Sequence, residues 1–421
     1  MRQVVTVREG IAILRSFKKQ CQAGLDRIFL FFYKRRVPLF IGLELLAILV
    51  LLGHLGIRRH TLSPVSLKPE AKTESCIQWV DFQVTSEAMT QAFRYDVATC
   101  QQEPHLNWIE LLAFLGASYG GDFSLYRPAD MEKLVQQRQA GTSMEELTRQ
   151  LDSYPYYLEA YQAVLGGMVG LYEIQIPRSE APAFALADAQ IQEGAPGDSQ
   201  DSDSFKNPTT LPNSETDVVP LTPSGEEKVW VTKYGLKAFH PLAKNFSYSH
   251  YDDFGVARSY GYRRKHLGHD MMGQVGTPVI AVESGRVEAI GWNPYGGWRL
   301  GIRSLDGKRY YYYAHLRKDY PYQAILQEGS IVCAGDVIGY LGRTGYSQTE
   351  NTNNIEEPHL HFGIQLIFDE SQKESDNEIW IDCYEIIRFL SVNRSESVKK
   401  EGTKEWTRVF QLKDPAIPEN E

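Results

Sequence analysis

His266-Leu-Gly-His-Asp270 and His359-Leu-His361 are the two stretches that decide what the C-terminal part of this 421-residue chain folds around. Alternate residues of a strand share a face, so His359 and His361 can enter one cleft. Residues four apart, such as His266 and Asp270, also align on a strand or helix. Tyr-Ala-His315 adds another imidazole between the two motifs. The spacing predicts a divalent-metal site made of histidine and carboxylate ligands.

The ligand types favour a catalytic site over a structural one. A structural zinc site is closed by four protein ligands, usually including cysteine, whereas a catalytic site has three and an open position. No cysteine lies beside the two motifs. One carboxylate ligand leaves bound Zn²⁺ with a net charge of about +1, which acidifies water toward a pKa of about 7 and polarises a carbonyl. Taken singly, each histidine has the alternative of being a core or surface residue, as for His250 and His269.

The sequence around the motifs is typical of a β domain. Short β-branched runs bounded by Gly and Pro, as in 276–285 and 335–345, predict strands and tight turns of an antiparallel sheet. On a strand, Tyr310-Tyr-Tyr-Tyr313 would alternate faces, so two rings would pack into the sheet and two would face outward, toward a groove. Asn293-Pro-Tyr-Gly-Gly-Trp298 indicates a turn at a hairpin tip or beside the cleft.

Residues from about 239 to 366 resemble the catalytic domain of lysostaphin-type (LytM-like) zinc endopeptidases, which cleave peptide bonds in bacterial peptidoglycan. That family has a His and an Asp four apart, and a His-x-His before an aromatic residue. Here these are His266 with Asp270, and His359-Leu-His361-Phe362. The resemblance implies an all-β peptidase domain whose Zn²⁺ is bound by His266, Asp270 and His361.

The same resemblance implies that His315 and His359 are catalytic residues that flank the metal without binding it. Asp253-Phe-Gly255, Arg258 and Thr344-Gly345 also agree with the family pattern. Hydrolysis of an amide needs a nucleophile, stabilisation of the oxyanion and a proton for the leaving amine. Zinc supplies the first two, and an unliganded histidine with a pKa near 6.5 supplies the third. Spacing alone leaves open how His315 and His359 divide this work, and which residue supports the ligand imidazoles.

The N-terminal region predicts the location. Residues 37–57 are apolar apart from Glu44 and His54, close to the ~20 residues that a transmembrane helix needs. Basic residues are denser in 1–36 than after the span, which predicts a cytoplasmic N-terminus and an extracellular catalytic domain. Because no small-residue cleavage site follows, we expect a retained single-pass anchor in the cytoplasmic membrane. Glu44 is costly in a bilayer and suggests a partner helix, and so a membrane or wall-machinery protein partner.

Charge agrees with this layout. Residues 1–60 hold 11 basic and 3 acidic side chains, so totals of 44 and 53 leave 33 and 50, a net charge of −17, for the rest. An acidic ectodomain argues against nucleic acid as a partner. Four cysteines (Cys76, Cys100, Cys333 and Cys383) fall on the outer side, where disulfides and free thiols are both open.

The predicted fold class is therefore multi-domain. Apolar residues at helical spacing in 105–115, and an N-cap with acids at Thr142-Ser-Met-Glu-Glu146, predict a small α-helical domain. Pro, Ser, Asp and Gly dominate 177–227, which predicts a disordered acidic linker. The predicted layout is as follows: a cytoplasmic basic segment 1–36, a transmembrane helix 37–57, a helical domain 79–175, a linker 177–227, a zinc peptidase domain 229–395 and a charged, disordered tail 396–421.

These patterns together favour a membrane-anchored zinc endopeptidase acting on peptidoglycan stem peptides or cross-bridges. One alternative is a non-hydrolytic cell-wall or complex scaffold that keeps the same fold. A second alternative is a bifunctional wall hydrolase with a glycosidase in 79–173, for which Glu110 would be the acid. The sequence does not specify the bond cleaved or the process served.

Overall fold

The computed structural model describes residues 77–181, 227–259, 263–373 and 375–418, with two short strands at 209–210 and 218–219. All of them belong to one compact unit, Cys76–Glu421. The expected basic segment 1–36 and transmembrane helix 37–57 lie outside the described residues. Within the described ranges, no helix is both long and apolar enough to cross a membrane.

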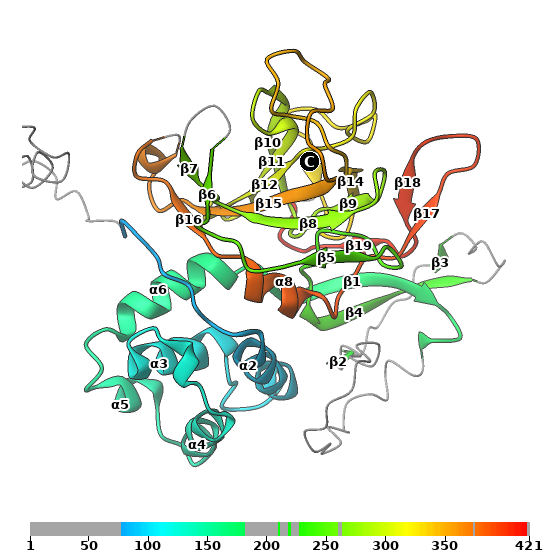
Figure 1. Ribbon diagram of the computed structural model, residues 1–421. Coiled ribbons are helices and arrows are strands. Elements are labelled where there is room, and N and C mark those ends of the chain that lie inside the picture. The colour runs from blue at the N-terminus through cyan, green and yellow to red at the C-terminus, as the bar shows by residue number, and fades with distance from the viewer. Residues whose placement is uncertain are drawn as a thin grey trace, which may run out of the picture. The chain divides into compact units, whose positions relative to one another are not determined.

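The first part of the unit is helical (Figure 1). Side-chain caps set the helix starts: Thr85 accepts from the amide of Ala88, and Asn107 accepts from the amides of Ile109 and Glu110. The helices expected at 105–115 and after Thr142 are confirmed as α3 and the short α5. The elements are α2 (Ser86–Thr99), α3 (Trp108–Tyr119), η1 (Phe123–Leu125), α4 (Pro128–Gln139), α5 (Met144–Thr148) and α6 (Tyr154–Leu165).

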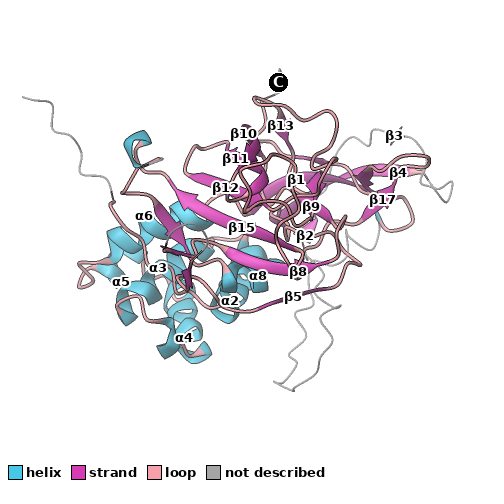
Figure 2. Cartoon of the chain, turned by 45° about the horizontal axis from the view of Figure 1, so that its top comes forward, coloured by secondary structure: helices cyan, strands magenta, loops and turns pink. Residues whose placement is uncertain are grey.

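The second part is an antiparallel β structure, as expected, and strands dominate it in Figure 2. Its main sheet has the order β13-β10-β11-β12-β15-β8-β5, and β16 also pairs with β15. The elements of this second part, inside and outside the main sheet, are β5 (Tyr248–His250), β6 (Ala257–Arg258), β7 (Arg264–Lys265), β8 (His269–Gly273), β9 (Pro278–Ile280), β10 (Gly285–Asn293), β11 (Gly297–Ser304), β12 (Arg309–Ala314), β13 (Ile331–Val332), β14 (Val337–Tyr340), β15 (His359–Leu366), η2 (Glu370–Gln372), β16 (Ile379–Ile381) and α8 (Tyr384–Leu390).

A second sheet joins the two parts. Strand β1 (Val169–Pro177) follows α6, and β4 (Lys228–Leu236) leads into the peptidase region. The two pair antiparallel at nine positions, from Val169↔Leu236 to Pro177↔Lys228. Short strands β2 (Thr209–Thr210) and β3 (Val218–Val219) pair with β4, and the rest of the expected linker between 182 and 226 lies outside the described residues. The helical and peptidase parts thus form one body, not two bodies separated by a tether as the sequence suggested.

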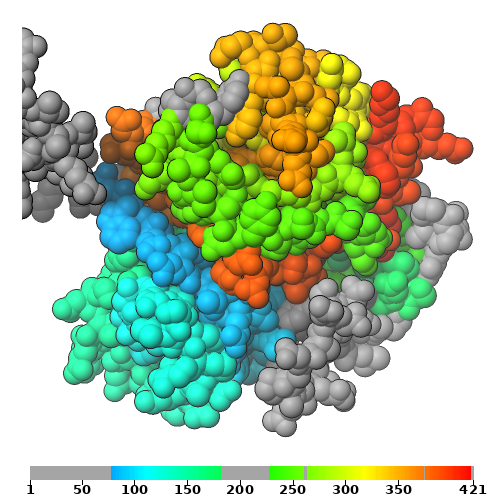
Figure 3. All heavy atoms as spheres, viewed as in Figure 1, coloured from blue at the N-terminus to red at the C-terminus, as the bar shows by residue number. Residues whose placement is uncertain are grey.

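Direct side-chain contacts also hold the two parts together. Trp108 of α3 stacks on Phe389 of α8 with ring centroids 5.6 Å apart. The amide of Ser86 donates to the Glu385 carboxylate at 2.6 Å. In the space-filling view the blue side chains of the first helix lie against the orange-red ones of α8 (Figure 3). The apolar face of the helical part is therefore covered by the peptidase part.

A buried arginine fixes the junction from inside. Arg309 of β12 is 0% exposed and donates through Nη1 to the carbonyl of Ala163 in α6 at 2.7 Å. Its Nε donates to Glu283 Oε2 at 2.8 Å, and the Tyr311 hydroxyl donates to the same oxygen at 2.6 Å. A buried guanidinium is tolerated only when paired and hydrogen-bonded in this way. The helical part therefore supplies an acceptor that the sheet needs.

The expected disordered tail is wrong for the described part of 396–421. Strand β17 (Ser397–Lys399) pairs with β18 (Trp406–Arg408), and β19 (Leu412–Lys413) pairs with β1. Arg408 is 6% exposed and donates to the carbonyl of Ala334 at 2.8 Å. The charged composition did not predict these strands, because the segment gains its order from partners far away in the sequence. Cys333 and Cys383 are free thiols.

Candidate metal centre and catalytic cleft

Strand register brings the predicted ligands together. In the pairing of β8 with β15, Asp270 lies directly opposite His361, so both side chains share one face of the sheet. His359 lies two residues before His361 on β15 and shares that face. His315 follows the end of β12, whose Ala314 also pairs with His361. His266 precedes β8 and completes the group.

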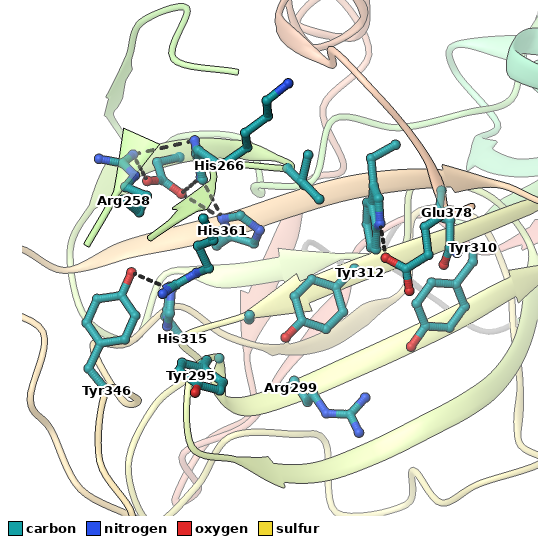
Figure 4. A pocket seen from close by; sticks show the side chains of 18 of the residues that line it. Arg258, His266, Tyr295, Arg299, Tyr310, Tyr312, His315, Tyr346, His361 and Glu378 are labelled. Carbon is teal, nitrogen blue, oxygen red and sulfur yellow. Dashed lines mark hydrogen bonds and ion pairs between the residues drawn. The ribbon is translucent and has the colours of Figure 1, made fainter. Parts of the chain in front are cut away.

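The three predicted ligands converge closely (Figure 4). His266 Nε2 lies 3.0 Å from Asp270 Oδ1 and 2.9 Å from His361 Nδ1. His361 Nδ1 lies 2.9 Å from the same Asp270 oxygen. Three ligand atoms of tetrahedral zinc, with bonds of about 2.0–2.1 Å, are separated by roughly 3.3 Å. The donor set and its spacing therefore fit Zn²⁺.

Asp253 and Arg258 form the support that the sequence could not assign. The Asp253 carboxylate lies 3.1 Å from His266 Nδ1, which keeps the proton on that nitrogen and directs the Nε2 lone pair to the metal position. Arg258 Nη2 lies 2.6 Å from Asp253 Oδ2 and 3.0 Å from Asp270 Oδ2. One guanidinium thus holds two carboxylates in place. The family resemblance had included both residues without giving them roles.

The pKa directions follow from this packing. Burial opposes ionisation of Asp270, but hydrogen bonds from His266 and His361 outweigh it and hold its pKa well below the usual range. Burial also opposes charging of His266, yet hydrogen bonds to Asp253 and Asp270 raise its pKa to about 9. In His361 the effect of burial prevails and lowers the pKa. An ionised carboxylate between two imidazoles calls for a cation, either a proton or a metal ion.

His315 and His359 lie beside the ligands with their tautomers fixed. His315 Nδ1 donates to the carbonyl of Thr344 at 2.9 Å, and His359 Nδ1 donates to that of Glu357 at 2.8 Å. Each neutral ring therefore keeps its Nε2 lone pair. The two rings are 4.8 Å apart, and His359 Nε2 lies 3.8 Å from Asp270 Oδ1. Burial and the neighbouring His359 hold the pKa of His315 well below 6.5, so this ring is a neutral proton acceptor.

A cleft of about 350 Å³ opens at this centre. Tyr310 and Tyr312 line it, whereas Tyr311 and Tyr313 join the core, which confirms the expected alternation. The turn at 293–298 also contributes Tyr295 and Gly296 to the lining. Arg264 lies over the rings of Tyr295 and Tyr346, 5.2 and 5.4 Å from their centroids. These rings and cations make the cleft suited to an extended polar chain.

The remaining candidates lie elsewhere. His269 neighbours Asp270 and so faces the opposite side of β8, where its Nε2 meets His250 Nδ1 at 2.8 Å. Both stay outside the ligand set, as expected. Glu110 lines a shallow depression of the helical part together with Glu159, a carboxylate that sequence spacing had not associated with it. Glu110 is half-buried and Glu159 exposed, unlike the enclosed acid of a glycosidase.

His266 and Asp270, both buried, and the half-buried His361 thus form a candidate metal centre, with His315 and His359 beside it. Residues 264–376 match the family described as Peptidase family M23. The matched region carries His266, Asp270 and His361, the three side chains that could together hold a metal ion. Its antiparallel fold, with Asp270 on β8 opposite His361 on β15, agrees with the resemblance seen in the motifs.

Several named proteins are similar to parts of this chain. The L-Ala–D-Glu endopeptidase of Bacillus subtilis is 40% identical over 31% of this chain and 38% of its own length. Lysostaphin of Staphylococcus staphylolyticus is 40% identical over 23% of this chain and 18% of its own length. A crystal structure named for the glycyl-glycine endopeptidase lytM of Ruminococcus gnavus is 19% identical, covers 80% of this chain and 96% of that one, and has a TM-score of 0.42. The chain thus spans well under half of the curated relatives it matches.

Gly268, inside the first motif, is a positioning residue that the sequence did not reveal. A Cβ at this position would lie 2.6 Å from His361 Nε2 and 2.8 Å from the backbone oxygen of Phe362. Gly268→Ala should therefore push the His361 ring away and weaken zinc affinity by about 10–100-fold, the range for disturbing the support of a metal ligand.

Zinc titration with a competing chelator measures this affinity. Gly170→Ala is the matched control because its added Cβ meets nothing nearer than 3.6 Å. Equal affinity in the two variants would contradict the packing argument.

Proposed function

We propose that this chain is a zinc-dependent endopeptidase that hydrolyses peptide bonds in peptidoglycan stem peptides or their cross-bridges. The observation that carries the proposal is the convergence of His266 Nε2, Asp270 Oδ1 and His361 Nδ1 at 2.9–3.0 Å beside two histidines with free Nε2 atoms. The matching relatives include endopeptidases named for L-Ala–D-Glu and glycyl-glycine bonds. Their shared reaction is cleavage of a peptide bond.

The residues divide the work as follows. His266, Asp270 and His361 would hold Zn²⁺, which supplies polarisation of the scissile carbonyl and acidification of water. His315 accepts the proton of the attacking water at Nε2 and passes it to the leaving amine. Its hydrogen bond to Thr344 and its backbone φ of 61° fix the ring direction. His359 orients the water from the other side through its own Nε2.

The scaffold alternative lacks a supporting observation in the described residues, because the metal ligands, Asp253 and both outer histidines are all in place. A non-hydrolytic scaffold with the same fold would not need a neutral imidazole aimed at the open side of the centre. The glycosidase alternative has only the open depression at Glu110. We therefore retain hydrolysis of peptide bonds as the proposal.

The proposed location is the outer face of the cytoplasmic membrane, with residues 37–57 as a single-pass anchor and the N-terminus inside. Its support is the apolar span and the excess of basic residues before it. Protease added to intact spheroplasts should remove a C-terminal epitope and spare an N-terminal one. Protection of the C-terminal epitope would contradict this location.

Substitutions should separate metal binding from proton transfer. His361→Ala removes a ligand, so bound zinc and activity should be lost together. His315→Asn should keep zinc while kcat falls by about 10²–10⁴-fold, the usual contribution of a general acid–base group. Asn is chosen because it tolerates the left-handed backbone found at residue 315.

Metal content by mass spectrometry and single-turnover kinetics give the two readouts. His105→Asn, in the helical part, is the control that should change neither. Full turnover by zinc-loaded His315→Asn protein would refute the role of His315.

Digestion of purified sacculi tests the reaction itself. The full chain should release fragments with new peptide termini, because the centre is built for amide hydrolysis. A chelator should stop this release and added Zn²⁺ should restore it. New reducing ends would instead support a glycosidase, and the absence of both products from the zinc-loaded protein would favour the scaffold. Mass spectrometry of the soluble fragments distinguishes these results, with His361→Ala protein as the control for metal-independent background.

A further inference from the structure

The cleft continues past the metal ligands along one face of β11, β12 and β15. Tyr312 lies opposite Gly301 on one side and Gly363 on the other. A Cβ at Gly301 would collide with the Tyr310 hydroxyl, and one at Gly363 would lie 2.8 Å from the Trp380 ring. The aromatic rings therefore lie over glycines and form a smooth floor. Tyr312 is three residues from His315, roughly 10 Å along an extended strand.

The extension of the cleft along β11, β12 and β15 is called the arm below. Two polar groups that line it have unmet hydrogen-bonding capacity. Arg299 Nε is buried and has no hydrogen-bond partner within the described part of the chain, where no carboxylate pairs with its guanidinium either. Gln365 is 2% exposed, and its Nε2 also has no partner among the described residues. A buried donor left unpaired is costly, which makes two in one cleft unusual. Both line the arm that also holds Tyr312.

Two other cations that line the cleft, Arg258 and Lys373, have carboxylate partners among the described residues, unlike Arg299. Arg258 pairs with Asp253 and Asp270. Lys373 pairs with Glu288. Figure 4 shows the Arg299 side chain on the opposite side of the Tyr310 and Tyr312 rings from Glu378.

Among the described residues that line the cleft, Glu378 is the one carboxylate besides Asp270. It already accepts a hydrogen bond from the Trp380 indole at 2.7 Å. The Tyr312 hydroxyl remains a donor, because burial raises its pKa to about 12. On the Arg299 side of β12 the arm therefore presents a guanidinium and the Tyr312 phenol, whereas Gln365 pairs with Trp380 and lies on the Glu378 side.

We propose that Arg299 and Tyr312 form a subsite for a carboxylate carried by the substrate peptide, so that the enzyme selects acidic peptides over polyglycine. A guanidinium matches a carboxylate with two parallel hydrogen bonds, which gives direction as well as affinity. Given the length of the arm, this carboxylate lies within about three residues of the scissile bond. The inference rests on the proposed endopeptidase function, since the arm begins at His315.

Matched peptides test the subsite with the full, zinc-loaded chain. The substrates are stem peptides isolated from sacculi, the same peptides with their carboxylates converted to carboxamides, and pentaglycine. Wild-type kcat/KM should be at least about tenfold higher for the free acids, the lower range for a hydrogen bond to a charged group. Arg299→Gln should remove most of this preference and leave the carboxamide rate within about twofold.

Controls separate recognition from folding. Arg299→Lys keeps the charge and should restore part of the preference. Arg286→Gln removes an exposed arginine of β10 outside the cleft and should change nothing. If Arg299→Gln lowers kcat/KM equally for the free acids and the carboxamides, the role of Arg299 is structural and the subsite is overturned.

Different experimental results would overturn the subsite and the proposed endopeptidase function. Equal cleavage of acid, carboxamide and pentaglycine would overturn the subsite and leave the endopeptidase standing. If the wild-type protein cleaves none of them, hydrolysis fails, and calorimetric binding of the same peptides then decides the subsite. Tighter binding of the free acids that is lost in Arg299→Gln would support it, and equal or absent binding would overturn it.

Discussion

The antiparallel pairing of β8 with β15 sets Asp270 directly opposite His361, and the rest of the centre is arranged around this pair. Side chains alternate along a strand, so a slip of one residue would turn both ligands to the other face of the sheet. The same alternation sends His269 away to His250 and keeps His359 beside His361. One register thus determines which histidines can meet a metal ion and which cannot.

Holding these charged groups together in a largely buried centre requires compensation, and charged neighbours supply it. Asp270 is buried between two imidazoles, and Arg258 reaches it from the far side while also holding Asp253. Because Asp253 in turn accepts from His266 Nδ1, the ring presents Nε2 to the centre. The candidate metal centre is therefore preorganised by Asp253 and Arg258, two residues outside the predicted ligand set.

The sequence could point to the five candidate residues that the structure brings together, because their motifs are local or belong to a family pattern. It also predicted the alternation of the tyrosine run, since a strand has a fixed period of two. It could not predict the effect of Gly268 on His361, which depends on the approach of two segments far apart in the chain. For the same reason it missed the ordered strands after residue 395 and the pairing of β1 with β4, whose partners lie across the fold. Charge and composition describe such segments poorly when their order comes from long-range contacts.

Strand β12 links the helical part to the chemistry. Its odd-numbered residues face inward, where Arg309 donates to the carbonyl of Ala163 and Tyr311 donates to Glu283. Its even-numbered residues Tyr310 and Tyr312 face the cleft, and His315 follows directly. A strand whose reverse face is fixed by buried ionic hydrogen bonds cannot shift without breaking them, at a cost of about 3–5 kcal/mol for an uncompensated charge. The helices therefore act on the cleft through the back of the strand that forms its floor, which gives them a role in positioning even though no reacting group comes from them.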